Sequence, residues 1–228
     1  MSTQLSTQPA ADHTVSRPGR AWAYVGVLAG VTGIASIQLS MSASPTYDPG
    51  APPTAESILG EMGQFIPQLI GFHVTTVLTA LLMIVFTAGL KRRLDRQAPA
   101  GSILPTVAML GLAGTASVLV LGSGLNTEFV FGLSQPELMV ASDVSFYSHW
   151  VATIPWLWVL AGLSGFALGL AALRGAAPRW IGVVGLVLGG LTMLTGLSPL
   201  QYLAGFVGPV WLLVTAIGFA VGDRTKTA

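Results

Sequence analysis

Residues 180–221 read WIGVVGLVLGGLTMLTGLSPLQYLAGFVGPVWLLVTAIGFAV and contain no Lys, Arg, Asp or Glu. A helix needs about 20 predominantly apolar residues to cross the hydrocarbon core of a bilayer. The stretch is therefore long enough for two crossings, which we place at Trp180–Leu200 and Tyr202–Val221. Its length and composition favour an integral membrane protein.

Four further apolar runs lie nearer the N-terminus. The first of them, Ala21–Met41, is longer than the apolar segment of about 7–15 residues that a signal peptide carries. We interpret it as a retained anchor, although Ser42-Ala43-Ser44 loosely matches a cleavage site and cleavage would leave five spans. The chain is thus predicted to be all-α, a polytopic bundle of six transmembrane helices. The four runs are Ala21–Met41, Pro67–Leu90, Ile103–Leu125 and His149–Leu173.

The composition of the whole chain agrees with this fold class. Charged residues make up 8% of the 228 residues, against about 25% in a soluble domain. Hydrophobic residues reach 52% and there are 28 glycines, which excludes a disordered chain or a coiled coil. Without cysteine, disulfides and thiolate chemistry are impossible. A formal net charge of +1 gives no reason to expect a nucleic-acid partner.

Basic residues all fall on one side of the six predicted crossings. Loops rich in Lys and Arg remain in the cytoplasm, so this side is expected to be cytoplasmic and to hold both termini. Six of the nine acids fall on the other side: Asp48, Glu56, Glu61, Glu128, Glu137 and Asp143. The ten bases are Arg17, Arg20, Lys91, Arg92, Arg93, Arg96, Arg174, Arg179, Arg224 and Lys226.

The chain divides into three parts. Residues 1–20 are rich in Ser, Thr, Gln, Pro and Ala and are expected to form a flexible cytoplasmic arm. Residues 21–222 form the six-helix transmembrane domain. Residues 223–228 are a short polar cytoplasmic tail.

Two longer segments on the outer side contain helix signals. Thr54 is a predicted N-cap, and apolar residues at helical spacing after it predict a short interfacial helix that bends at Pro67. Ser134-Gln135-Pro136-Glu137 resembles a capping box and predicts that the fourth helix begins near Gln135. The two segments either cap the bundle or form a lid over an outward-facing pocket.

The candidate site residues are polar or aromatic groups in the outer half of the predicted bundle. His73 is the one ionisable side chain placed within the hydrocarbon, and such residues are functional candidates by default. The alternative is a neutral His73 that is hydrogen-bonded to a neighbouring helix. We predict a ligand-binding wall formed by Gln68, His73, Thr76 and His149, with Trp156 nearby.

A metal site at the two histidines is not expected. His73 lies 18 residues from Lys91 and His149 lies 25 residues from Arg174. At a rise of about 1.5 Å per residue, the imidazoles differ in height by roughly 10 Å. No HExxH motif or Cys/His cluster is present. We therefore predict no metal and no cofactor.

Glycines and tryptophans receive mainly structural interpretations. The pairs Gly26/Gly30, Gly165/Gly169 and Gly185/Gly189 have the GxxxG spacing that permits close helix approach. Trp150, Trp180 and Tyr202 are expected at the membrane interfaces. Trp156, Trp158 and Trp211 lie deeper, and Pro155 and Pro209 predict kinked helices around a hydrophobic cavity.

The C-terminal half also resembles a broad group of small bacterial, often actinobacterial, six-helix membrane proteins that carry a domain of unknown function. The likeness covers about Ala21 to Gly222 and implies a compact bundle in a bacterial plasma membrane. It implies no activity and no catalytic residues. It rests on Ser148-His149-Trp150, Gly169-Leu170-Ala171-Ala172-Leu173-Arg174, Ala177-Pro178-Arg179-Trp180-Ile181-Gly182 and Gly208-Pro209-Val210-Trp211-Leu212-Leu213.

Four functions fit the sequence. The favoured one is a non-enzymatic membrane protein that binds a lipid or small apolar molecule in an outward-facing cavity. A small transporter would need discontinuous helices and a site near the midplane. A membrane enzyme or redox protein would use His73, His149, Glu61 or Asp143. An accessory subunit would have a membrane partner, and the sequence leaves a homo-oligomer open as well.

Overall fold

The structure is a computed structural model that describes residues 19–45 and 50–222, and the regular secondary structure of these residues is helical. Five short segments of 3-10 or π type interrupt, join or extend the α-helices. In chain order the elements are α1 (Ala21–Ser42), α2 (Ala55–Met62), η1 (Gly63–Phe65), α3 (Ile66–Asp95), α4 (Leu104–Gly122), α5 (Asn126–Gly132), η2 (Pro136–Leu138), α6 (Ala141–Thr153), η3 (Ile154–Trp156), α7 (Val159–Leu173), α8 (Arg179–Val184), η4 (Gly185–Gly189), α9 (Gly190–Leu197), α10 (Tyr202–Ile217) and η5 (Gly218–Gly222).

Six helical stretches of the described chain are long and apolar enough to cross a membrane. The prediction of six transmembrane helices in an all-α bundle is therefore confirmed. Helices suit such a chain because their backbone N–H and C=O groups pair within the segment. The hydrocarbon offers these groups no hydrogen-bond partner. The stretches are Ala21–Ser42, Ala55–Asp95, Leu104–Gly132, Ala141–Leu173, Arg179–Leu197 and Tyr202–Gly222.

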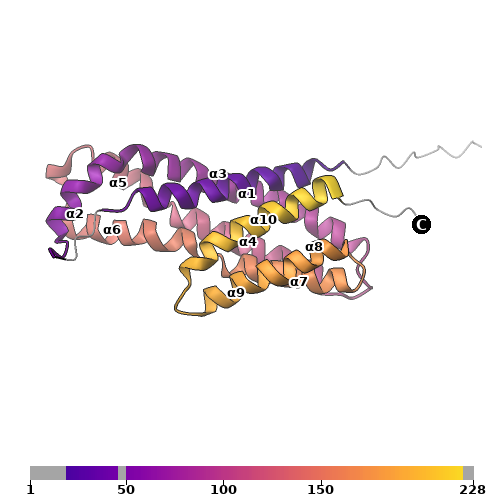
Figure 1. The fold of residues 1–228 in the computed structure, drawn as a ribbon. Helices are drawn as coiled ribbons and strands as arrows, with labels where there is room; N and C mark the ends of the chain where they lie inside the picture. The colour runs from indigo at the N-terminus through magenta and orange to yellow at the C-terminus, as the bar shows by residue number, and fades with distance from the viewer. Residues whose placement is uncertain (1–18, 46–49, 223–228) are drawn as a thin grey trace, which may run out of the picture.

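The six stretches form a closed ring of contacts. Helix α1 packs between α3 and α10, α3 packs on α4, and α4 packs on α7. Helix α7 contacts the stretch formed by α8, η4 and α9, and α9 packs on α10 to complete the ring. The helices run roughly along one common axis (Figure 1), so the bundle is elongated.

The basic residues gather at one end of the bundle. Arg20 at the start of α1 donates to the carbonyl of Ala220 at 3.1 Å, which joins the two ends of the described chain. Arg93 at the end of α3 donates to the carbonyl of Ala176 at 3.1 Å, between the two basic turns. Figure 1 shows α1 beginning and α10 ending at this end. The other described bases lie there too: Lys91, Arg92, Arg96, Arg174 and Arg179.

The opposite end carries a helical extension that we call the cap. It consists of α2, η1, α5, η2, α6 and the first turns of α3, and Figure 1 shows it beyond the turn between α9 and α10. With 30 residues, α3 is about 45 Å long, whereas the hydrocarbon core is about 30 Å thick. The described cap holds five acids and no Lys or Arg: Glu56, Glu61, Glu128, Glu137 and Asp143.

The cap confirms one predicted helix start and corrects another. Thr54 caps α2 as predicted, because its side chain accepts from the Ser57 backbone N–H at 3.2 Å. Helix α2 packs against α6, as part of the cap. The prediction that the fourth helix begins near Gln135 is wrong. Pro136–Leu138 is a single 3-10 turn without a side-chain cap, and α6 begins only at Ala141.

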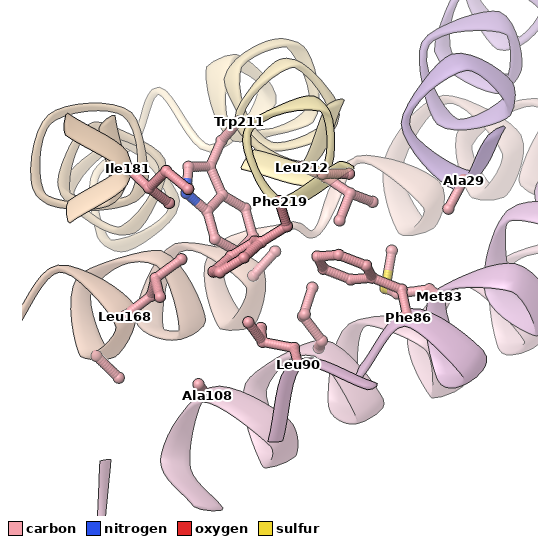
Figure 2. Packing of buried hydrophobic residues seen from close by; sticks show 14 of the residues in the cluster. Ala29, Met83, Phe86, Leu90, Ala108, Leu168, Ile181, Trp211, Leu212 and Phe219 are labelled. Atoms are coloured by element: carbon pink, nitrogen blue, oxygen red, sulfur yellow. The ribbon is translucent and has the colours of Figure 1, made fainter. Parts of the chain in front are cut away.

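Large apolar side chains fill the interior of the basic half. Figure 2 shows Trp211 and Leu212 from α10 converging with Phe86 and Leu90 from α3, and Phe219 between them. Phe86, Leu90, Trp211 and Leu212 have 0% exposure, and Phe219 has 1%. This half of the bundle is a packed core.

The predicted glycine spacings bring helices into close contact. A Cβ added to Gly189 of η4 would lie 2.7 Å from the Cα of Gly165 on α7, and one added to Gly165 would lie 2.8 Å from the Cα of Gly189. A Cβ on Gly30 of α1 would lie 2.6 Å from the Cα of Leu213. Only glycine permits these backbones to approach so closely.

Candidate functional site: the junction between bundle and cap

The fourth membrane stretch is broken where the bundle meets the cap. Helix α6 ends at Thr153, one 3-10 turn follows, and α7 begins at Val159. Pro155 lies in this turn and lacks the backbone N–H that a continuing helix would use. The predicted kink at Pro155 is thus a complete interruption, whereas α10 continues through Pro209.

Side chains satisfy backbone carbonyls around this interruption. Ser40 of α1 donates to the Val151 carbonyl at 2.8 Å and accepts from the indole N–H of Trp156 at 3.0 Å. Trp158 donates its indole N–H to the Pro155 carbonyl at 3.0 Å. Both indoles are buried. Hydrogen bonds of this kind are what allow irregular backbone to exist at membrane depth.

Ser40 is the last member of a serine–threonine seam, a row of three hydroxyl residues on α1 of which the first two pair with hydroxyls of α3. Thr79 donates to the hydroxyl of Thr32 at 2.8 Å, and the hydroxyls of Ser36 and Thr76 lie 2.6 Å apart. The seam residues of α1 (Thr32, Ser36 and Ser40) recur every four residues and so share one face of the helix. The sequence analysis missed this face, although its four-residue spacing was the available signal.

We call the interruption between Thr153 and Val159, with the side chains around it, the junction. Contacts from several helices place it at one level along the bundle axis. Gly71 of α3 faces Leu39 of α1, and Gly122 of α4 faces Pro155. The other flank of the bundle ends here as well, because the Tyr202 and Thr153 hydroxyls lie 3.3 Å apart. The 19 residues from Arg179 to Leu197 span about 28 Å, close to the thickness of the hydrocarbon core. The junction therefore coincides with the expected membrane boundary.

The five predicted site residues do not form one cluster. Thr76 and Trp156 both bond to the seam, Thr76 through Ser36 and Trp156 through Ser40. His149 is exposed on α6 in the cap. Gln68 and His73 lie in the first turns of α3, five residues apart, which separates them by about 140° around the helix. They occupy opposite flanks of its buried face.

A buried pair in the cap was also missed. The Tyr147 hydroxyl of α6 donates to the Asn126 side-chain carbonyl of α5 at 3.1 Å. The ring of Tyr147 stacks on Phe129 with centroids 4.2 Å apart. Tyr147 has 0% exposure and Asn126 has 1%. An Asn that ends a long apolar run was the only sequence signal for this pair.

Three buried polar atoms near the junction lack a hydrogen-bond partner: Gln68 Oε1, His73 Nδ1 and Asn126 Nδ2. Leaving a buried polar group unpaired costs about 1–3 kcal/mol, so each such atom needs a reason. The predicted alternative for His73, a hydrogen bond to a neighbouring helix, is not formed by this atom. Elsewhere in the described chain the unpaired atoms belong to Thr87, Ser102, Trp211 and Thr215.

Charge is kept at the surface of the described residues. The side chains buried there include Ser, Thr and Asn but no Asp, Glu, Lys or Arg. No three His, Asp or Glu side chains within the described ranges converge where they could hold a metal ion. The junction therefore offers hydrogen bonds and apolar surface rather than fixed charge.

Fold and junction together define a multi-pass helical membrane protein with a broken fourth span and an acidic helical cap. Comparison with protein-family models, with curated proteins and with solved structures finds no match to this chain.

Proposed function

We propose that this chain is a non-enzymatic membrane protein that binds a lipid or small apolar molecule from the outer side, at the junction between bundle and cap. The unpaired atoms of Gln68, His73 and Asn126 carry the proposal. They lie beside the apolar cluster of the cap, which includes Leu69, Phe72 and Phe129. An amphipathic molecule that inserts between the helices here would meet both polar and apolar groups.

The three groups lie at one level of the bundle, on different faces of its helices. His73 lies two residues past Gly71, which faces Leu39 in the junction, and Gln68 lies three residues before it. Asn126 lies four residues past Gly122, which faces Pro155. Each group is thus within about 6 Å of the junction along the axis. This level is the one at which lipid headgroups would lie, which supports a binding role for groups here.

The test compares His73→Leu with Thr215→Val, which removes an equally unpaired buried group from α10 in the basic half. The chain is purified in detergent, stripped of lipid and returned to a lipid extract while its unfolding is followed. A ligand present at 100 times its Kd stabilises the fold by about 2.7 kcal/mol. We expect wild type and Thr215→Val to show this gain, and His73→Leu to lose most of it.

Lipid-free variants provide the control. Without a ligand, neither substitution removes a hydrogen bond of the described structure, so both should leave stability unchanged or raise it. Equal gains from lipid in all three proteins would remove His73 from the site. No gain in any of them would refute the proposed function.

A small transporter is the second candidate, and the break at Pro155 is the observation that favours it. Discontinuous helices are typical of transporter binding sites, although those sites lie near the midplane. Here the break lies near one boundary, and the described part of the bundle buries no charged side chain to couple an ion. Solute uptake into liposomes that contain the purified chain would establish transport.

We further propose that the chain lies in a bacterial plasma membrane with both termini in the cytoplasm. Gln97 follows α3 at the basic end and Ser134 lies in the cap, and both are exposed. Since the chain has no cysteine, Gln97→Cys and Ser134→Cys report each side without background. An impermeant thiol reagent on intact cells should label Ser134→Cys and spare Gln97→Cys. The reverse labelling would contradict this orientation.

A further inference from the structure

Two exposed arginines at the basic end continue an exposed apolar stripe of α3. Leu81 and Val85 are 60% and 51% exposed, and Ala88 is exposed as well. Arg92 and Arg96 follow at the same spacing of three or four residues, and Arg96 keeps helical backbone angles just past the end of α3. The five positions therefore lie along one face of the helix. In a bilayer, an acyl chain that contacts Leu81 and Val85 has its headgroup on the side of the two arginines.

These arginines have no carboxylate to neutralise them among the described residues. Asp95 is the one acid that the structure describes at this end, and it is paired with the Lys91 ammonium at 2.6 Å. Arg92 and Arg96 are one helical turn apart, with about 5–6 Å between their Cβ atoms. The carbonyls at the end of a helix contribute a partial charge of only about −0.5. The face is therefore positively charged.

A second basic turn adds to this positive field. Arg93, next to Arg92 in the chain, donates to the Ala176 carbonyl at 3.1 Å and so ties the end of α3 to the turn between α7 and α8. That turn holds Arg174 and Arg179, and both are exposed. Since a chain spans at most about 3.6 Å per residue, their Cα atoms lie within about 7 and 11 Å of the Ala176 Cα. Like charges held this close together attract an anion.

We propose that the basic end binds an anionic phospholipid, with its phosphate at Arg92 and Arg96 and an acyl chain along Leu81 and Val85. Arginine is suited to this headgroup because its guanidinium donates two parallel hydrogen bonds to phosphate oxygens. The apolar stripe favours a phospholipid over a soluble phosphate, which has no chain to lie on it. The site is at the opposite end from the junction and goes beyond the function proposed there.

The experiment compares two phospholipids that share their acyl chains. Dioleoylphosphatidylglycerol is anionic, whereas dioleoylphosphatidylcholine is zwitterionic. Each is added to the purified, lipid-stripped full chain in a neutral detergent, and its affinity is obtained from the rise of the unfolding midpoint with lipid concentration. We expect the anionic lipid to bind at least about tenfold more tightly at low salt, and salt to reduce the difference by screening. Equal affinity for the two lipids would overturn the proposal.

Two matched double variants test the position of the site. Arg92→Gln with Arg96→Gln, and Arg174→Gln with Arg179→Gln, each remove two positive charges from exposed positions, so both should fold. A basic residue beside an anionic lipid surface strengthens binding about fivefold. We therefore expect the α3 variant to bind dioleoylphosphatidylglycerol about tenfold more weakly or worse. The variant of the second turn, whose charges act from further away, should lose less than about threefold. Equal losses would overturn the assignment to α3.

Inorganic phosphate distinguishes a lipid headgroup from a free anion. Added to the lipid-stripped chain at the same concentration as the anionic lipid, it should leave the unfolding midpoint unchanged, because it makes no contact with the apolar stripe. A rise as large as that given by dioleoylphosphatidylglycerol, and absent from the α3 variant, would show a site for a soluble anion and overturn the lipid assignment.

Discussion

Gly189→Ala is expected to destabilise the bundle by about 3 kcal/mol, the upper end of the range for overpacked cores. The added methyl would meet backbone on the neighbouring helix, 2.7 Å from the Cα and 2.8 Å from the carbonyl carbon of Gly165. Backbone atoms cannot rotate aside as a flexible side chain does, so α7 and η4 must separate. Reversible unfolding in mixed micelles, followed by circular dichroism, measures the loss.

The adjacent Gly190→Ala is the matched control. A Cβ at Gly190 would have one neighbour within 4 Å, the Phe166 ring at 3.9 Å. Alanine is favoured over glycine within a helix by about 0.5–1 kcal/mol, so this variant should be neutral or slightly more stable. Similar losses for the two variants would show that helix flexibility, rather than close approach to α7, is what these glycines provide.

Most of the bundle could be predicted from the sequence because hydrocarbon imposes strict rules on a chain. A spanning segment must be long, apolar and helical, so the charge-free stretch 180–221 could be assigned directly to membrane helices. The glycine pair on η4 was predicted as a close contact for a similar reason, since small residues enable close packing between membrane helices. Neither inference needed knowledge of which helix was the neighbour.

The junction could not be predicted because its features depend on partners from distant segments. Pro155 signalled a distortion, but the extent of the break depends on Ser40, 115 residues earlier in the chain, which bonds to Val151 and Trp156. The seam on α1 likewise becomes meaningful only opposite Thr76 and Thr79. A single sequence does not show which helices are paired.

The sequence identified polar residues near the junction but could not show which of them have partners. Gln68 and His73 were chosen as polar residues in an apolar helix, and both have a buried, unpaired atom. Thr76 was chosen on the same ground, yet its hydroxyl is satisfied by Ser36. His149 was chosen as a polar residue at the outer end of the predicted fourth span, whereas the structure places it on α6 in the cap, where it is exposed.

Trp158 is the side chain that holds the broken span against the rest of the bundle. Its indole has 1% exposure and lies between glycines of two helices. A Cβ on Gly33 of α1 would meet the ring at 3.2 Å, and one on Gly208 of α10 would meet it at 2.8 Å. The ring also donates to the Pro155 carbonyl within the break itself. Packing and hydrogen bonding thus converge on one residue.

Trp158→Ala is therefore expected to destabilise the fold by about 3–5 kcal/mol, the usual cost of removing a buried aromatic ring. Trp158→Phe keeps most of the ring but leaves the Pro155 carbonyl without its donor, and should cost about 1–3 kcal/mol. Unfolding in mixed micelles measures both losses, and the order Ala above Phe tests whether packing outweighs the hydrogen bond. A cost below about 1 kcal/mol for Trp158→Ala would contradict a packed junction, because burial of a large side chain alone contributes more than that.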